Sequence, residues 1–159
     1  MELAQAAWVL RVLGLSVATT GASAGSPAAA ADWRSVRAGW QDAIETVDGQ
    51  ITTLTAAMRA SDDDAMEIIA DRGMNALTGD HKVKLMAALM DLGSGDRAAM
   101  QKSGPKALAI ARQFSAHIET DERIAACEDN PFGVPLTIRA TIGPALATLI
   151  AAIEAGMRP

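Results

Sequence analysis

The stretch that decides the fold is DWRSVRAGWQDAIETVDGQITTLTAAMRA, residues 32–60. Its apolar side chains recur at intervals of three and four residues, which places them on one stripe of an α-helix. Asp32 is a good N-cap residue, so we expect the helix to begin there. The segment therefore predicts an amphipathic helix whose stripe covers a hydrophobic core. The stripe consists of Trp33, Val36, Trp40, Ala43, Ile44, Val47, Ile51, Leu54 and Met58.

The chain beyond this helix also predicts helices. A second helix follows the acidic run at residues 61–64, and the sequence at residues 78–80 interrupts it near Gly79. Pro105 is predicted to open the next long helix and Pro135 the last one, because Pro is well tolerated at a first helical position.

The chain has four main helices if the two segments on either side of Gly79 are counted as one broken helix. Short connections favour antiparallel neighbours, so we predict an all-α fold, an up-down helical bundle of four main helices. The bundle forms one domain over residues 32–159. The composition agrees, since aromatic residues make up only 3% of the chain and there is no Tyr.

The first 24 residues have the parts of a secretion signal. Arg11 precedes an apolar run at residues 12–18, and Ala22-Ser23-Ala24 is a small-residue exit. We predict a cleavable signal over residues 1–24, with an alternative end at Ala31, and a flexible spacer over residues 25–31. The protein is then periplasmic or secreted by a bacterium. The alternative is an amphipathic N-terminal helix that a cytosolic protein retains.

The net charge of −5 bears on the class of partner. A nucleic-acid binder needs Lys and Arg clustered on one face, and here the basic residues are scattered among acidic ones. We therefore expect no nucleic-acid partner.

Cys127 is the only cysteine, so the chain forms no internal disulfide. We expect this free thiol to be buried, the alternative being a disulfide bond between two chains.

The last helix, from Leu136 to about Met157, is apolar nearly all the way round. Such helices lie at a core centre or in a membrane. Arg139 would be costly in lipid, so we expect a buried core helix rather than membrane insertion. A small-residue ladder, Gly143, Ala147, Ala151 and Ala155, would let another helix approach closely, which leaves a homo-oligomer through helix packing open.

One stripe of metal-binding side chains stands out. His117, Asp121 and Glu128 share one side of a continuous helix and suit zinc or a similar ion. A solvated helix face has the same spacing, and we favour that interpretation. Haem held by His117 and a methionine is a further alternative. Met86 and Met90 are spaced like soft ligands for Cu(I), but we expect them to fill the core.

The loop at residues 129–135 contains one of only two phenylalanines. Phe132, with Asn130 and Glu128, could anchor a protein partner on a loop stiffened by proline. The alternative, which we favour, is that Phe132 folds back over the end of the bundle.

Catalytic motifs are absent from the sequence. It contains no nucleophile elbow, phosphate-cradling loop or His-Glu-x-x-His, and two histidines and one cysteine leave few parts for acid–base or nucleophilic chemistry. We expect a non-enzymatic protein without a cofactor, which acts through contact with an unknown protein partner as an accessory, chaperone-like or inhibitory subunit. The alternatives are a metal- or haem-binding bundle and a protein that associates with membranes through its last helix.

Overall fold

The computed structural model describes residues 28–72, 74 and 77–159, and the regular secondary structure in these ranges is entirely helical. The all-α prediction is confirmed, whereas the predicted signal sequence lies outside the described residues. The helices are α2 (Ala28–Ala60), α3 (Asp64–Arg72), α4 (Gly79–Leu92), α5 (Arg97–Thr120), α6 (Glu122–Glu128) and α7 (Ile138–Met157).

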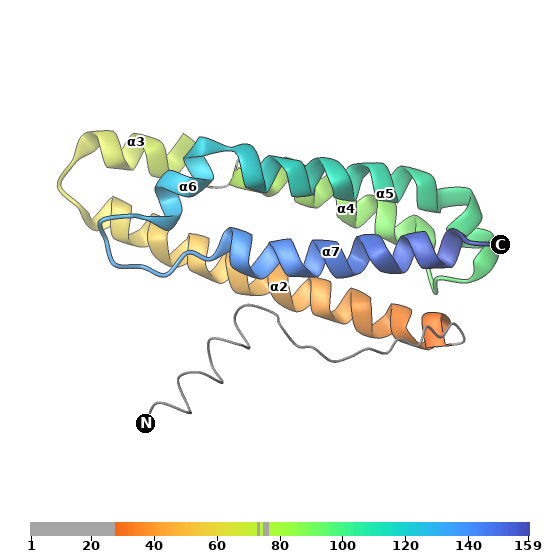
Figure 1. The fold of residues 1–159 in the computed structure, drawn as a ribbon. Coiled ribbons are helices and arrows are strands. Elements are labelled where there is room, and N and C mark those ends of the chain that lie inside the picture. The colour runs from red at the N-terminus through yellow and green to blue at the C-terminus, as the bar shows by residue number, and fades with distance from the viewer. Residues whose placement is uncertain (1–27, 73, 75–76) are drawn as a thin grey trace, which may run out of the picture.

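The four longest helices lie side by side, with α3 and α6 toward one end (Figure 1). The closest pairs are α5 with α7, α2 with α7, and α4 with α5. The side where α2 faces α4 is packed less closely than these three. The predicted interruption near Gly79 is also present, since α3 ends at Arg72 and α4 begins at Gly79.

The stripe predicted for residues 32–60 forms the α2 part of the core. Eight of its nine side chains are buried, and Val36 packs partly buried against the same cluster. α2 begins at Ala28, earlier than the predicted cap at Asp32 and inside the segment expected to be a spacer.

α7 buries one face rather than its whole circumference. Its core side chains are Ile138, Ile142, Leu146, Leu149 and Ile153, each with 0% of its surface exposed. The ladder residues Ala147, Ala151 and Ala155 face outward, so within this chain the ladder does not serve helix packing. By length and composition alone, α7 is the one described helix that could cross a membrane.

Two helix boundaries differ from the prediction. α5 begins at Arg97, where the Asp96 side chain accepts a hydrogen bond from the Ala99 N–H (2.9 Å), and it continues through Pro105. Gly104 is buried there, and a Cβ atom at this position would lie 2.7 Å from the Met157 side chain. The absence of a side chain at Gly104 therefore lets the end of α7 pack closely on α5.

The last helix begins at Ile138 rather than Pro135, and its start is joined to two other elements. The Thr137 N–H donates to Gln50 Oε1 on α2 (2.9 Å). The Arg139 N–H donates to Glu128 Oε1 at the end of α6 (2.8 Å). These bonds satisfy backbone donors that a helix start leaves without an intrahelical partner.

Candidate functional site: a groove between α2 and α4

A groove of about 480 Å³ runs between α2 and α4. Trp40, Ile44 and Leu89 are buried beneath it, and Met86 and Met90 stand beside them on the α4 side. Clefts that bind ligands or peptide segments commonly combine such an apolar lining with a few polar groups at the edge. We call this feature the α2/α4 groove.

The two methionines of the groove are exposed, so the prediction that they fill the core is wrong. Met90 exposes 74% of its surface and Met86 51%, and Val83, on the same outer face of α4, exposes 64%. α4 buries a different face, formed by Leu85, Ala88, Leu89 and Leu92. The helix thus carries an inner apolar face against the core and an outer apolar face, Val83, Met86 and Met90, against solvent.

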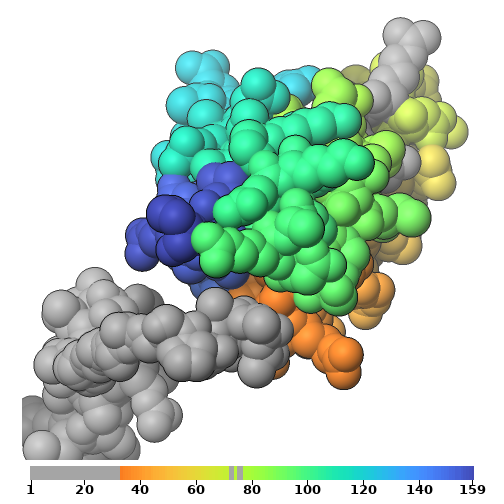
Figure 2. All heavy atoms as spheres, turned by 90° about the vertical axis from the view of Figure 1, so that its right-hand side faces the viewer, coloured from red at the N-terminus to blue at the C-terminus, as the bar shows by residue number. Residues whose placement is uncertain are grey.

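A second hollow of about 710 Å³ adjoins one end of the groove, near the turn after α4. Figure 2 looks onto this end of the molecule, where α2 lies below the helices coloured green. The hollow is lined mainly by Trp33, Arg34, Arg37, Gln41, Gly93 and Ser94, and we call it the arginine hollow. It shares Arg37 and Gln41 with the α2/α4 groove, so the two are adjacent.

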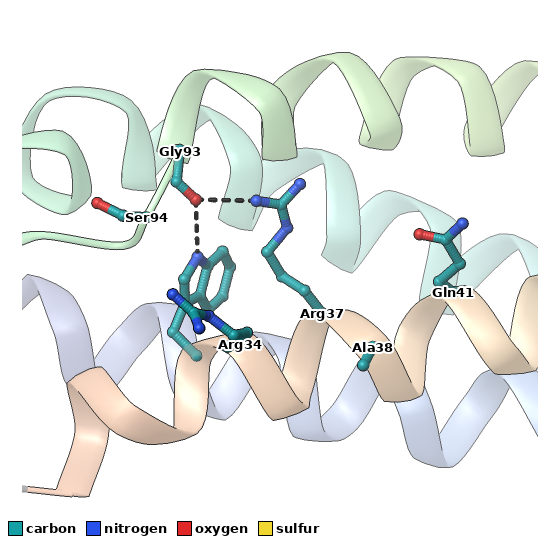
Figure 3. A pocket seen from close by; sticks show the side chains of 7 residues that line it. Arg34, Arg37, Ala38, Gln41, Gly93 and Ser94 are labelled. Carbon is teal, nitrogen blue, oxygen red and sulfur yellow. Dashed lines mark hydrogen bonds between the residues drawn. The ribbon is translucent and has the colours of Figure 1, made fainter.

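Two hydrogen bonds to one carbonyl hold the arginine hollow together (Figure 3). The Gly93 carbonyl accepts from Trp33 Nε1 (3.2 Å) and from an Arg37 guanidinium N–H (2.9 Å). Gly95 lies against the Trp33 ring with φ at 77°, and a Cβ atom there would be 2.3 Å from Trp33 Cδ1. Glycine is therefore required at position 95 for both its backbone conformation and the space beside the indole.

The other end of the groove is spanned by an ion pair. Lys82 Nζ on α4 lies 2.9 Å from Asp48 Oδ2 on α2, and the Lys82 side chain is 23% exposed. Together with the Arg37–Gly93 bond, this pair links the two helices on either side of the apolar stretch. The helices are thus tied at both ends of the groove and leave its middle open.

The two histidines of the chain stack on one another beside the core. The ring centroids of His81 and His117 are 4.3 Å apart, and His81 also stacks on Phe114 at 5.4 Å. His117 Nε2–H donates to the Leu77 carbonyl oxygen at 2.7 Å. Burial lowers the pKa of His81, and the neighbouring His117 lowers it further.

The structure brings His117 and Asp121 together but directs Glu128 elsewhere. His117 Nδ1 lies 3.6 Å from Asp121 Oδ2, whereas Glu128 accepts the Arg139 backbone bond. The continuous helix assumed for this stripe is wrong, because α5 ends at Thr120 and the Asp121 side chain caps α6. Hydrogen bonds from Arg123 hold the pKa of Asp121 well below its usual range.

The described residues include no group of three or more His, Cys, Asp or Glu side chains placed to hold a metal ion. Metal or haem binding by this chain is the alternative to a solvated helix face, and it stays an untested alternative. Of the predicted ligands, Asp121 is paired with the Arg123 guanidinium at 2.7 Å, which competes directly with any cation for the carboxylate.

The loop after α6 is organised by Asn130. Its amide N–H groups donate to the Cys127 and Val134 carbonyls, and its carbonyl oxygen accepts from the Phe132 N–H. Phe132 is partly buried and packs against the core. These contacts account for Asn130 and Phe132 as parts of a closed turn, and their role in partner binding stays a prediction.

Cys127 is half-buried and carries no disulfide in the structure. Burial raises the pKa of its thiol, an effect that the nearby Arg123 partly opposes. Because the thiolate is the reactive form, this position favours an inert thiol at neutral pH.

No protein-family model matches the chain, and no curated protein or solved structure matches it. The function is therefore argued from the geometry of the chain itself. Sequence reasoning missed the α2/α4 groove, although one signal for it was present. α4 has more apolar positions than one buried face of a helix accommodates, and the surplus is Val83, Met86 and Met90.

Proposed function

We propose that this protein is an exported, non-enzymatic helical bundle that binds a protein partner in the α2/α4 groove. The proposal includes a cleavable signal before the bundle and an up-down order of its four main helices. The observation that carries it is the outer apolar face of α4, because large exposed apolar side chains beside a hollow mark interaction sites.

The chemistry of the groove supports a protein partner in particular. Methionine side chains are flexible and polarizable, so a surface that presents them adapts to the shape of a partner helix. Trp40 beneath them is 5% exposed and forms a rigid floor for the groove. Accessory, chaperone-like and inhibitory roles all use such a groove.

The test is capture of the partner from a bacterial envelope extract with the immobilised full chain. Met86→Gln combined with Met90→Gln should lose the captured protein, because both changes place amides on the apolar wall. Ile68→Gln is the matched control, since Ile68 on α3 exposes 55% of its surface, close to the 51% of Met86. Equal capture by all three proteins would contradict the proposal.

The export part of the proposal has its own measurement. Mass spectrometry of the protein from its native cell should find an N-terminus at residue 25 or 32. An intact Met1 would contradict export without affecting the groove.

Membrane association through α7 is a second candidate, since α7 has the length and composition of a spanning helix. Against it, insertion would withdraw five fully buried isoleucine and leucine side chains from the core. We therefore expect the full chain to stay at the bottom of the gradient in a liposome flotation assay. Flotation would favour the membrane function over the groove.

A further inference from the structure

The α2/α4 groove and the adjacent arginine hollow differ in charge. In the arginine hollow, Arg34 and Arg37 lie one helical turn apart on α2. Neither forms an ion pair with a residue that the structure describes, and no described acidic side chain lines this hollow. In a chain with a net charge of −5, two arginines without acidic neighbours form a local cationic site.

The opposite end of the groove carries no free charge of this kind. Lys82 and Asp48 neutralise one another there, and Gln41 donates to Glu45 (3.1 Å) along the rim between the ends. The groove thus has an apolar floor, carries the Glu45 carboxylate on its rim and the Lys82–Asp48 ion pair at one end, and is cationic at the Arg34 end. A ligand that matches it has a direction, with an apolar body and an anionic terminus.

The length of the groove fits a helix. Fourteen positions separate Arg34 from Asp48 along α2, which at 1.5 Å per residue is about 21 Å, or roughly four helical turns. The C-terminal end of a helix is negative because of its dipole, and a free carboxylate or a terminal Glu adds to that charge. Arginine binds carboxylates well because its planar guanidinium presents paired donors.

We infer that the α2/α4 groove binds an amphipathic partner helix with its acidic C-terminal end on Arg34 and Arg37. This inference rests on the proposed function and adds the chemistry and direction of the partner. Apolar side chains of the helix, spaced three and four residues apart, contact Met86 and Met90 above the buried Trp40. The carboxylates at its end meet the two guanidinium groups that line the arginine hollow.

The experiment measures the binding of two synthetic helical peptides to the full chain by isothermal titration calorimetry. Both peptides carry leucines every three or four residues over about four turns. One ends in two glutamates with a free carboxylate, and the other ends in two lysines with an amide. At low salt we expect the acidic peptide to bind about tenfold more tightly, an advantage that falls as salt rises.

Two variants separate the parts of the inference. Arg34→Gln combined with Arg37→Gln should remove the preference for the acidic peptide. Both peptides should then bind with the affinity that their leucines supply. Met90→Gln should weaken both peptides alike. Arg112→Gln is a control that removes one arginine away from the groove, where Arg112 pairs with Glu154 between α5 and α7. It should change neither the preference for the acidic peptide nor the affinity.

The outcomes distinguish a failure of the acidic preference from a failure of the proposed protein-binding function. Equal binding of both peptides, lost only in Met90→Gln, would overturn the acidic preference and leave the proposed function standing. Binding of neither peptide would overturn the groove as a helix site and the proposed function with it. Binding of dodecanoate but of neither peptide would also overturn the inference, because the occupant would then be a fatty carboxylate.

Discussion

The side of the molecule between α5 and α7 and the side between α2 and α4 use methionine in opposite ways. On the α5/α7 side, Met100 is 2% exposed and packs against Gly156, and Met157 packs against Gly104. On the α2/α4 side, Met86 and Met90 meet no such glycine and face solvent beside Trp40. On the α5/α7 side, Gly104 and Gly156 let the methionines pack closely between the helices, and no described glycine makes such a contact with Met86 or Met90.

The largest expected effect lies in the closed part of the core. Leu146→Ala should lower the free energy of unfolding by about 2–5 kcal/mol, because Leu146 is fully buried and its truncation leaves a cavity. Urea unfolding followed by circular dichroism measures it. A loss below about 1 kcal/mol would mean that α7 is not packed as the structure places it.

The next effect tests the contact between Gly95 and the Trp33 ring beside the arginine hollow. Gly95→Ala should destabilise by about 2–4 kcal/mol, because Ala tolerates positive φ poorly and its Cβ would displace the Trp33 ring. Gly133→Ala is the matched control. It has φ at 68° with open space around the site, so only the cost of the backbone, about 1–2 kcal/mol, applies. Equal losses of unfolding free energy in the two variants would show that the contact with the Trp33 indole does not add to the cost at Gly95.

A titration tests the packing of α4 on α5. The pKa of His81 lies below 6.5 in the folded protein, so below pH 6.5 the unfolded state binds a proton that the folded state resists. Stability is therefore fully present above pH 6.5 and falls as the pH drops toward the folded pKa. Asp80 opposes this shift, while His117 and Lys84 add to it.

His81→Gln should flatten that dependence between pH 7.5 and pH 5.5, measured as urea midpoints at each pH. An unchanged slope in the variant would show that His81 is not the group responsible. The value at pH 7.5 serves as the baseline, because His81 is neutral there in both states.

The ion pair across the groove should contribute little. A double-mutant cycle with Lys82→Gln and Asp48→Asn should give a coupling of about 0.2–1 kcal/mol, since Asp48 is 44% exposed. The same cycle on Lys84 and Asp80, a more exposed pair within α4, is the comparison and should give less. A coupling above about 2 kcal/mol would mean that the α2/α4 side is more closed than described.

The smallest effect is expected at the open wall itself. Met90→Ala should change stability by less than about 0.5 kcal/mol, because its side chain is already mostly in water. Thermal unfolding measures the change. A loss comparable to that of Leu146→Ala would show that Met90 belongs to the core.

Much of the helical architecture was predictable from the sequence, and the reasons differ by element. The α2 stripe could be predicted because its apolar positions are separated from its charged ones around the helix. α4 could not be divided in the same way, because apolar residues occupy two of its faces and local pattern does not say which face meets the core. The groove depends on that choice and so on tertiary packing.

The errors at helix ends have a common cause. Pro105 is predicted to open a helix, yet α5 begins at Arg97 after the Asp96 cap and continues through Pro105. Asp121 reads as one position in a helical stripe, yet its side chain caps α6 and ends the stripe. In both places an aspartate side chain caps a helix, Asp96 for α5 and Asp121 for α6, and the cap decides where the helix begins.

The central claim is that α2 and α4 leave an open, methionine-walled groove. Peroxide oxidation of the full chain, followed residue by residue by peptide mass spectrometry, tests it directly. Met86 and Met90 should oxidise at least about tenfold faster than Met58, Met74 and Met100, whose exposure is 5% or less. Oxidation of Met86 and Met90 at the slow rate of Met58 and Met100 would contradict the open groove.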